Sequence, residues 1–70
     1  MDSMTEIRVR GLEGKAAMLE RHADEREARI QRLSRLGGYE FFSALEQSEQ
    51  DRNEARKLRR ESAQLRRQDS

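Results

Sequence analysis

The chain has 70 residues, of which 15 are basic and 14 acidic, so its formal net charge is only +1. That length admits one domain at most, and so short a chain usually needs a disulfide, a metal or oligomerisation to supplement its core. Cysteine is absent and His22 is the single histidine, which excludes a disulfide framework and a thiolate zinc site. Self-association or a partner protein remains as the expected support.

Composition favours a charged helical protein over a disordered one. Leu, Ile, Val and Phe together number only 12 of 70. Such a low share of large apolar residues indicates disorder only when the net charge is also high. No stretch approaches the roughly 20 apolar residues that span a bilayer, and no signal-peptide pattern is present. We therefore expect a cytoplasmic protein that does not bind membranes.

Residues 1–14 are expected to form a flexible or partner-ordered N-terminal arm. From Glu6 to Arg10 the residues alternate between polar and apolar, as in an edge strand, although Val9 and Leu12 also fit the helical register that follows. If the arm pairs, adding a strand to a partner's sheet is the natural mode.

The rest of the chain predicts two helices. Residues 15–36 and 39–67 are rich in Ala, Leu, Glu, Arg and Gln, all strong helix formers, and a disordered tail is expected over 68–70. Between the helices, Gly37 and Gly38 provide a turn short enough to make the helices antiparallel neighbours. The predicted fold is therefore all-α, an antiparallel two-helix hairpin of the coiled-coil kind.

The glycine pair leaves one alternative open. A single long helix through both glycines would cost about 1 kcal/mol per glycine relative to alanine. In the hairpin, one glycine adopts the left-handed conformation that closes the first helix, and Arg32 and Arg35 in the last turn complement its dipole.

A heptad pattern predicts the faces that the two helices bury. In the first helix the core positions are Val9, Ala16, Ala23 and Ile30 together with Leu12, Leu19, Arg26 and Leu33. In the second helix they are Phe41, Ser48, Ala55 and Ser62 together with Ala44, Asp51, Leu58 and Leu65. Antiparallel folding about the glycines then pairs residues whose numbers sum to about 75, for example Leu33 with Phe41 and Leu19 with Ala55.

One charged residue interrupts the seam, which is the line of contact between these two heptad faces. Arg26 falls opposite Ser48, Glu49 and Asp51, and a charged layer of Arg26 with Asp51 would set the register of the two helices. The alternative is that the Arg26 side chain extends along the surface into water.

Apolar residues outside the seam predict a second interface. Ile7, Met18 and Leu36 lie on another face of the first helix, and Tyr39, Phe41 and Phe42 are all the aromatic residues of the chain. Aromatic side chains at an exposed helical end are typical of binding hot spots. The expected protein interface comprises Met18, Leu36, Tyr39, Phe42 and Leu45, buried either in a homodimeric four-helix bundle or against a different protein.

A stripe of arginines on the second helix suggests an alternative partner. At 100 degrees per residue, six arginines fall within an arc of about 120 degrees, namely Arg52, Arg56, Arg59, Arg60, Arg66 and Arg67. Such a stripe suits phosphate and would give salt-dependent, sequence-independent nucleic-acid binding. Interspersed acidic residues reduce the local charge, so a solvated face or an acidic protein partner is favoured.

Catalysis has little support in the sequence. His22 lies among Glu20, Asp24 and Glu25, but a charged helical surface brings such residues together by chance. We expect no catalytic residues, metal, cofactor or small-molecule substrate. The predicted function is a non-enzymatic protein–protein interaction module, such as a small adaptor, chaperone or assembly subunit, with nucleic-acid binding as the alternative.

Overall fold

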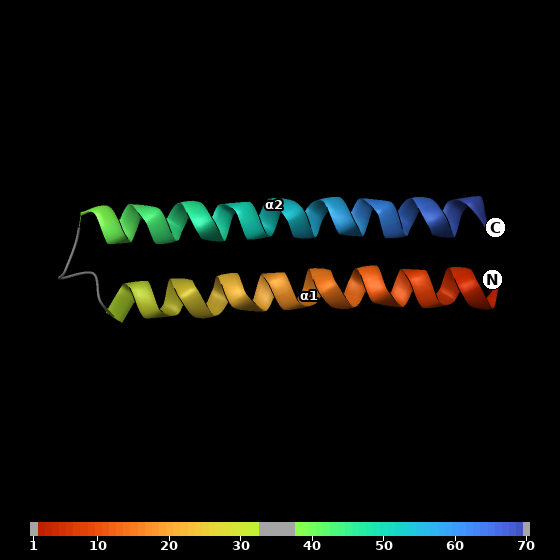
Figure 1. Ribbon diagram of the computed structural model, residues 1–70, viewed down its shortest axis with the longest axis horizontal. Helices are drawn as coiled ribbons and strands as arrows, with labels where there is room; N and C mark the ends of the chain where they lie inside the picture. The colour runs from red at the N-terminus through yellow and green to blue at the C-terminus, as the bar shows by residue number, and fades with distance from the viewer. Residues whose placement is uncertain (1, 33–37, 70) are drawn as a thin grey trace.

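The computed structural model describes residues 2–32 and 38–69, which form two α-helices, α1 (Ser3–Arg32) and α2 (Tyr39–Gln68). The helices lie side by side and antiparallel, with both ends of the chain at the same end of the molecule (Figure 1). The molecule measures 51 × 13 × 11 Å, and its radius of gyration of 15.8 Å exceeds the roughly 11 Å of a compact chain of this length. The predicted all-α hairpin is confirmed.

The first helix begins much earlier than the sequence predicted. Residues 3–14, expected to belong to an arm, are helical, and the strand-like interpretation of Glu6 to Arg10 is wrong. Asp2 caps this helix because its Oδ1 accepts a hydrogen bond of 3.0 Å from the Met4 amide. Val9 is only 2% exposed, so packing against α2 holds the first turns in the helix.

Gly38 directly precedes the second helix. Its φ of 72° and ψ of −129° lie in a region that side-chain-bearing residues rarely adopt, and its carbonyl accepts a 3.2 Å bond from the Phe42 amide. Gly38 therefore marks the start of α2. The predicted first-helix end at Leu36, Arg35 in its last turn, and Gly37 lie outside the described residues.

At its other end α2 extends to Gln68, one residue beyond the predicted end at 67. The Asp69 amide donates to the Leu65 carbonyl at 3.2 Å, and the Asp69 side chain accepts a 2.8 Å bond from the Asp2 amide. The end of α2 is thus tied to the start of α1.

The two helices bury the heptad faces that the sequence indicated. The buried residues of α1 are Val9, Ala16, Ala23 and Ile30, and those of α2 are Ser48, Ala55, Leu58 and Ser62. Ala16, Ala55 and Leu58 form the central cluster, against which Leu12 and Leu19 pack. Alanine and serine in the seam let the two backbones approach closely, so the core is thin. The predicted contact of Leu33 with Phe41 lies outside the described residues.

Candidate interaction surfaces

Three interhelical ion pairs follow one flank of the seam. The acidic partners on α1 are spaced seven residues apart, as are the basic partners on α2, so each heptad contributes one pair. The pairs, which we call the Glu–Arg ladder, are Glu13 with Arg66, Glu20 with Arg59 and Glu27 with Arg52. The angular grouping of the arginines does not reveal the matching seven-residue period of the glutamates, which is visible in the sequence.

Hydrogen bonding within the ladder shifts the pKa values of Glu13, Glu20 and Arg59. The pKa of Glu13 is lowered, first because the Ser62 hydroxyl donates to its carboxylate at 3.0 Å and then because Arg66 bonds to the same oxygen at 2.7 Å. Hydrogen bonds from Arg59 lower the pKa of Glu20, and the pKa of Arg59 is raised in return. These two carboxylates therefore stay ionised to a lower pH than an ordinary glutamate.

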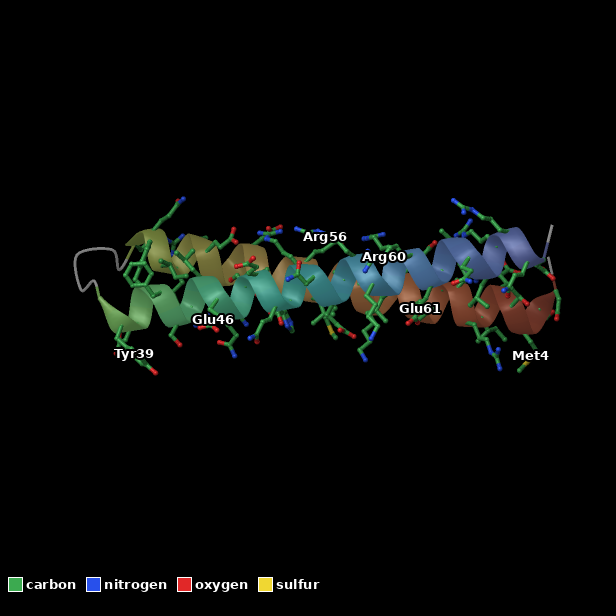
Figure 2. All side chains as sticks on the ribbon, turned by 90° about the horizontal axis from the view of Figure 1, so that it is seen from above. Met4, Tyr39, Glu46, Arg56, Arg60 and Glu61 are labelled. Atoms are coloured by element: carbon green, nitrogen blue, oxygen red, sulfur yellow. The ribbon has the colours of Figure 1, made fainter. Side chains whose placement is uncertain are left out.

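The ladder engages half of the arginine stripe. Arg52, Arg59 and Arg66 are turned toward α1 rather than presented to a ligand. Arg56 donates to Asn53 on its own helix at 2.8 Å, and Arg60 has no hydrogen bond or ion pair within the part of the chain that the structure describes. Figure 2 labels Arg56 and Arg60 near the middle of the rod. Three of the six stripe arginines thus pair with α1, whereas Arg56, Arg60 and Arg67 are exposed outside the ladder.

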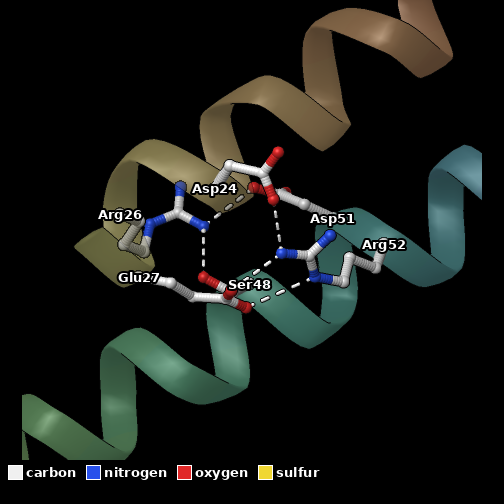
Figure 3. Close-up of polar contacts among 6 residues, drawn as sticks. All are labelled: Asp24, Arg26, Glu27, Ser48, Asp51 and Arg52. Atoms are coloured by element: carbon white, nitrogen blue, oxygen red, sulfur yellow. Dashed lines mark hydrogen bonds and ion pairs between the residues drawn. The ribbon is translucent and has the colours of Figure 1, made fainter. Parts of the chain in front are cut away.

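The charged layer at Arg26 is present in the seam. Its Nη1 lies 2.9 Å from Asp51 Oδ2 and 3.3 Å from Ser48 Oγ (Figure 3). The side chains of Arg26 and Asp51 are 24% and 22% exposed, so both charges are largely withdrawn from water. The predicted contact is confirmed, and the role of this pair in setting the register stays a prediction.

Arg52 adds a second charged contact at the same level of the rod. Its guanidinium donates to Asp24 at 2.7 Å and to Glu27 at 2.8 and 3.3 Å. The hydrogen bonds that Arg52 donates to Glu27 and then to Asp24 are the main reasons that its pKa is raised. Two arginines, one from each helix, thus fasten the hairpin at this layer.

Aromatic and aliphatic side chains stand exposed at the start of α2. Tyr39 is 87% exposed, Phe42 69% and Leu45 38%; we call these three residues the aromatic tip. Phe41 is half-buried, and its ring meets that of Phe42 edge to face with centroids 5.7 Å apart. Phe41 thus anchors a tip whose other rings face solvent. Leu36, predicted to join it, lies outside the described residues.

Met18 does not lie with the aromatic tip. Antiparallel pairing places it near Lys57, roughly 27 Å along the rod from Tyr39 at 1.5 Å per residue. It is 41% exposed and belongs instead with Met4 and Ile7, which are 62% and 64% exposed. The structure therefore separates the predicted interface into two surfaces at opposite halves of the rod, with Tyr39 and Met4 near opposite ends in Figure 2.

The surroundings of His22 offer little chemistry. A shallow surface hollow of about 230 Å³ is lined by His22, Glu25, Arg26 and Arg29, and no group of three or more potential metal ligands occurs within residues 2–32 and 38–69. The hollow is open to solvent and lined by charged side chains.

Comparisons with known proteins identify no relative. No family model, curated protein or solved structure matches the chain. Neither described helix combines the length and the apolar character needed to cross a membrane.

Proposed function

We propose that this hairpin is a non-enzymatic protein–protein interaction module that docks through its aromatic tip, with a second copy of itself as the simplest partner. The observation that carries the proposal is the exposure of Tyr39 and Phe42 at the start of a regular helix. Aromatic side chains on a rigid element bury a large area at little entropic cost, which makes them frequent hot spots. The expected cytoplasmic setting belongs to the same proposal.

The rest of the rod supports a scaffold role. Its seam is narrow, and charged side chains beside it pair across the two helices through the Glu–Arg ladder and the Arg26 layer. An aromatic tip at the end of a regular rod suits an adaptor or assembly subunit, because the rod presents the tip away from the rest of the chain. The ladder also argues against nucleic acid, since it occupies three of the six stripe arginines.

Sedimentation equilibrium of the full chain tests the proposal. We expect the wild-type protein to associate at micromolar concentration and Phe42→Glu to be monomeric, because a carboxylate at the tip would be desolvated on association. Arg56→Glu with Arg60→Glu is the matched control, because it changes exposed residues outside the tip and should leave association intact. A wild-type protein that stays monomeric at all concentrations would contradict self-association.

The nucleic-acid alternative is tested on the same variants. Fluorescence anisotropy with a labelled 20-base-pair duplex and a labelled single-stranded RNA is expected to show no binding at 150 mM salt. Tight binding that weakens steeply with salt and is lost in the Arg56→Glu, Arg60→Glu variant would favour the arginine stripe instead.

A further inference from the structure

A second stripe lies on the side of α1 that faces away from α2. Its members recur at alternating spacings of three and four residues and span an arc of about 80 degrees at 100 degrees per residue. They are Met4, Ile7, Gly11, Gly14 and Met18, which we call the outer face of α1. The three apolar side chains are all substantially exposed, at 62%, 64% and 41%. The outer face therefore has the periodicity of a helix-packing seam without a helix packed on it.

The two glycines of the outer face have no role within the hairpin. Both lie inside α1, where glycine is less favourable than alanine. A Cβ atom built on Gly11 or Gly14 would meet nothing within 4 Å, and neither has a positive φ. What the missing side chains do provide is a shallow notch in the helix surface between Ile7 and Met18. Such a notch allows the backbone of another helix to approach closely.

The charges beside the outer face are basic. Arg8 and Lys15 flank it on one side and form no ion pair within the part of the chain that the structure describes, while Arg10 and Arg21 flank it on the other. The glutamates of the Glu–Arg ladder lie on the opposite side of α1, turned toward α2. Two acidic residues are exceptions: the Glu6 carboxylate accepts a 2.9 Å bond from Arg10, and Glu25 follows Met18 on the same face one heptad later. The outer face thus presents an apolar, notched stripe between two basic margins.

We propose that the outer face of α1 binds an amphipathic α-helix of a partner protein whose apolar stripe is bordered by acidic residues. The stripe from Met4 to Met18 is about 21 Å long, so it accommodates roughly four turns of such a helix. Acidic borders on the incoming helix would meet Arg8 and Lys15 on one margin and Arg10 on the other.

Two other occupants fit these observations less well. A second copy packed α1 against α1 with its glycines at the crossing would bring Lys15 close to its own counterpart and Arg10 close to its own, and like charges disfavour that contact. An anionic bilayer would satisfy the basic margins but makes no use of the notch at Gly11 and Gly14. A bilayer also binds a broader apolar face than this narrow stripe.

The probe is a synthetic 21-residue helix of three heptads with alanine and leucine at its core positions and glutamate at both borders. A matched peptide carries lysine at the borders. Titrations followed by NMR of the isotopically labelled full chain are expected to show binding of the glutamate peptide at least tenfold tighter than that of the lysine peptide. The shifts should concentrate at residues 4–18.

Substitutions in the notch test the geometry. Gly11→Leu and Gly14→Leu should each weaken binding of the glutamate peptide at least tenfold. The melting temperatures of both variants should stay at or above that of the wild type, because leucine favours the helix. Gln64→Leu, an exposed leucine substitution on α2, should leave binding unchanged. Phe42→Glu should also leave it unchanged, which separates this surface from the aromatic tip.

Several results would overturn the proposal. These are equal affinity for the two peptides, shifts centred elsewhere, or full binding by the Gly11→Leu and Gly14→Leu variants. Wild-type dimerisation that Gly11→Leu abolishes would assign the outer face to a second copy. The outer face would be assigned to a membrane surface if the chain bound phosphatidylserine vesicles but not the glutamate peptide, and if Ile7→Glu reduced the vesicle binding.

Discussion

Arg26 occupies a core heptad position at which Leu12 and Leu19 stand in the two preceding heptads. Its guanidinium is satisfied by Asp51 and Ser48, and no buried side-chain nitrogen or oxygen in the described residues lacks a hydrogen bond. Ser62, the other buried serine, donates to Glu13. Each buried hydroxyl on α2 thus meets a charged residue of α1, so polar matching accompanies apolar packing.

Removing one member of the Arg26–Asp51 pair should lower the free energy of unfolding more than removing both. We expect Arg26→Leu to lower the free energy of unfolding by about 1–3 kcal/mol, because Asp51 is left largely buried without a counter-charge. The double variant Arg26→Leu, Asp51→Leu should recover most of that loss, since two apolar side chains replace the pair. Urea denaturation followed by circular dichroism measures both. A double variant no more stable than the single one would contradict this account.

At the scale of the helices, the conformation of Gly38 distinguishes it from the other described glycines. Its φ is positive, whereas Gly11 and Gly14 have ordinary helical backbones. A Cβ on Gly38 would meet nothing within 4 Å, so any penalty for a side chain there arises from the backbone conformation alone. This position marks where the chain enters α2.

Alanine substitutions at two exposed glycines should therefore change the stability of the hairpin in opposite directions. Gly38→Ala is expected to destabilise the hairpin by about 1 kcal/mol or more, because alanine disfavours that backbone conformation. Gly11→Ala is the matched control and should stabilise it by up to about 1 kcal/mol, since it replaces an exposed glycine within a helix. Thermal unfolding followed by circular dichroism measures the stability change of each variant. Equal shifts in the two variants would show that the positive φ has no energetic consequence.

At the scale of the whole molecule, the Glu–Arg ladder makes stability depend on pH. The folded-state pKa values of Glu13 and Glu20 lie below their ordinary value of 4.5, so the unfolded chain takes up protons more readily than the folded one. Their contribution to stability is present above pH 4.5 and is lost as the pH falls through the lowered values. The rod should therefore unfold more easily in acid.

This dependence is measurable with a matched variant. We expect the melting temperature of the wild type to fall between pH 5 and pH 3, and that of Glu13→Gln, Glu20→Gln to fall less over the same interval, because the linked carboxylates are absent. High salt should reduce the difference between the two proteins at pH 7, since the ladder is partly exposed. Parallel curves for the two proteins would assign the acid sensitivity to other groups.

Helix content, the antiparallel pairing and the buried stripe could all be predicted from the sequence. Helix propensity and heptad period are local properties, and the buried Val9, Ala16, Ala23 and Ile30 could be read from spacing alone. The antiparallel register that follows from the heptads also predicts Arg26 opposite Asp51. The start of α1 was missed because the cap at Asp2 and the tertiary burial of Val9 outweigh the two glycines that follow.

Only the tertiary structure decided which charges meet and which remain outward. A shift of the helices by one heptad would keep heptad positions in the seam yet give two of the three glutamates Glu13, Glu20 and Glu27 a different arginine and leave the third without one, so spacing alone does not choose the partners. The observed register turns these glutamates toward α2 and leaves basic residues beside Met4, Ile7 and Met18. Local pattern determined the elements of this protein, whereas the character of its surfaces depends on the relative position of two helices, which long-range contacts set.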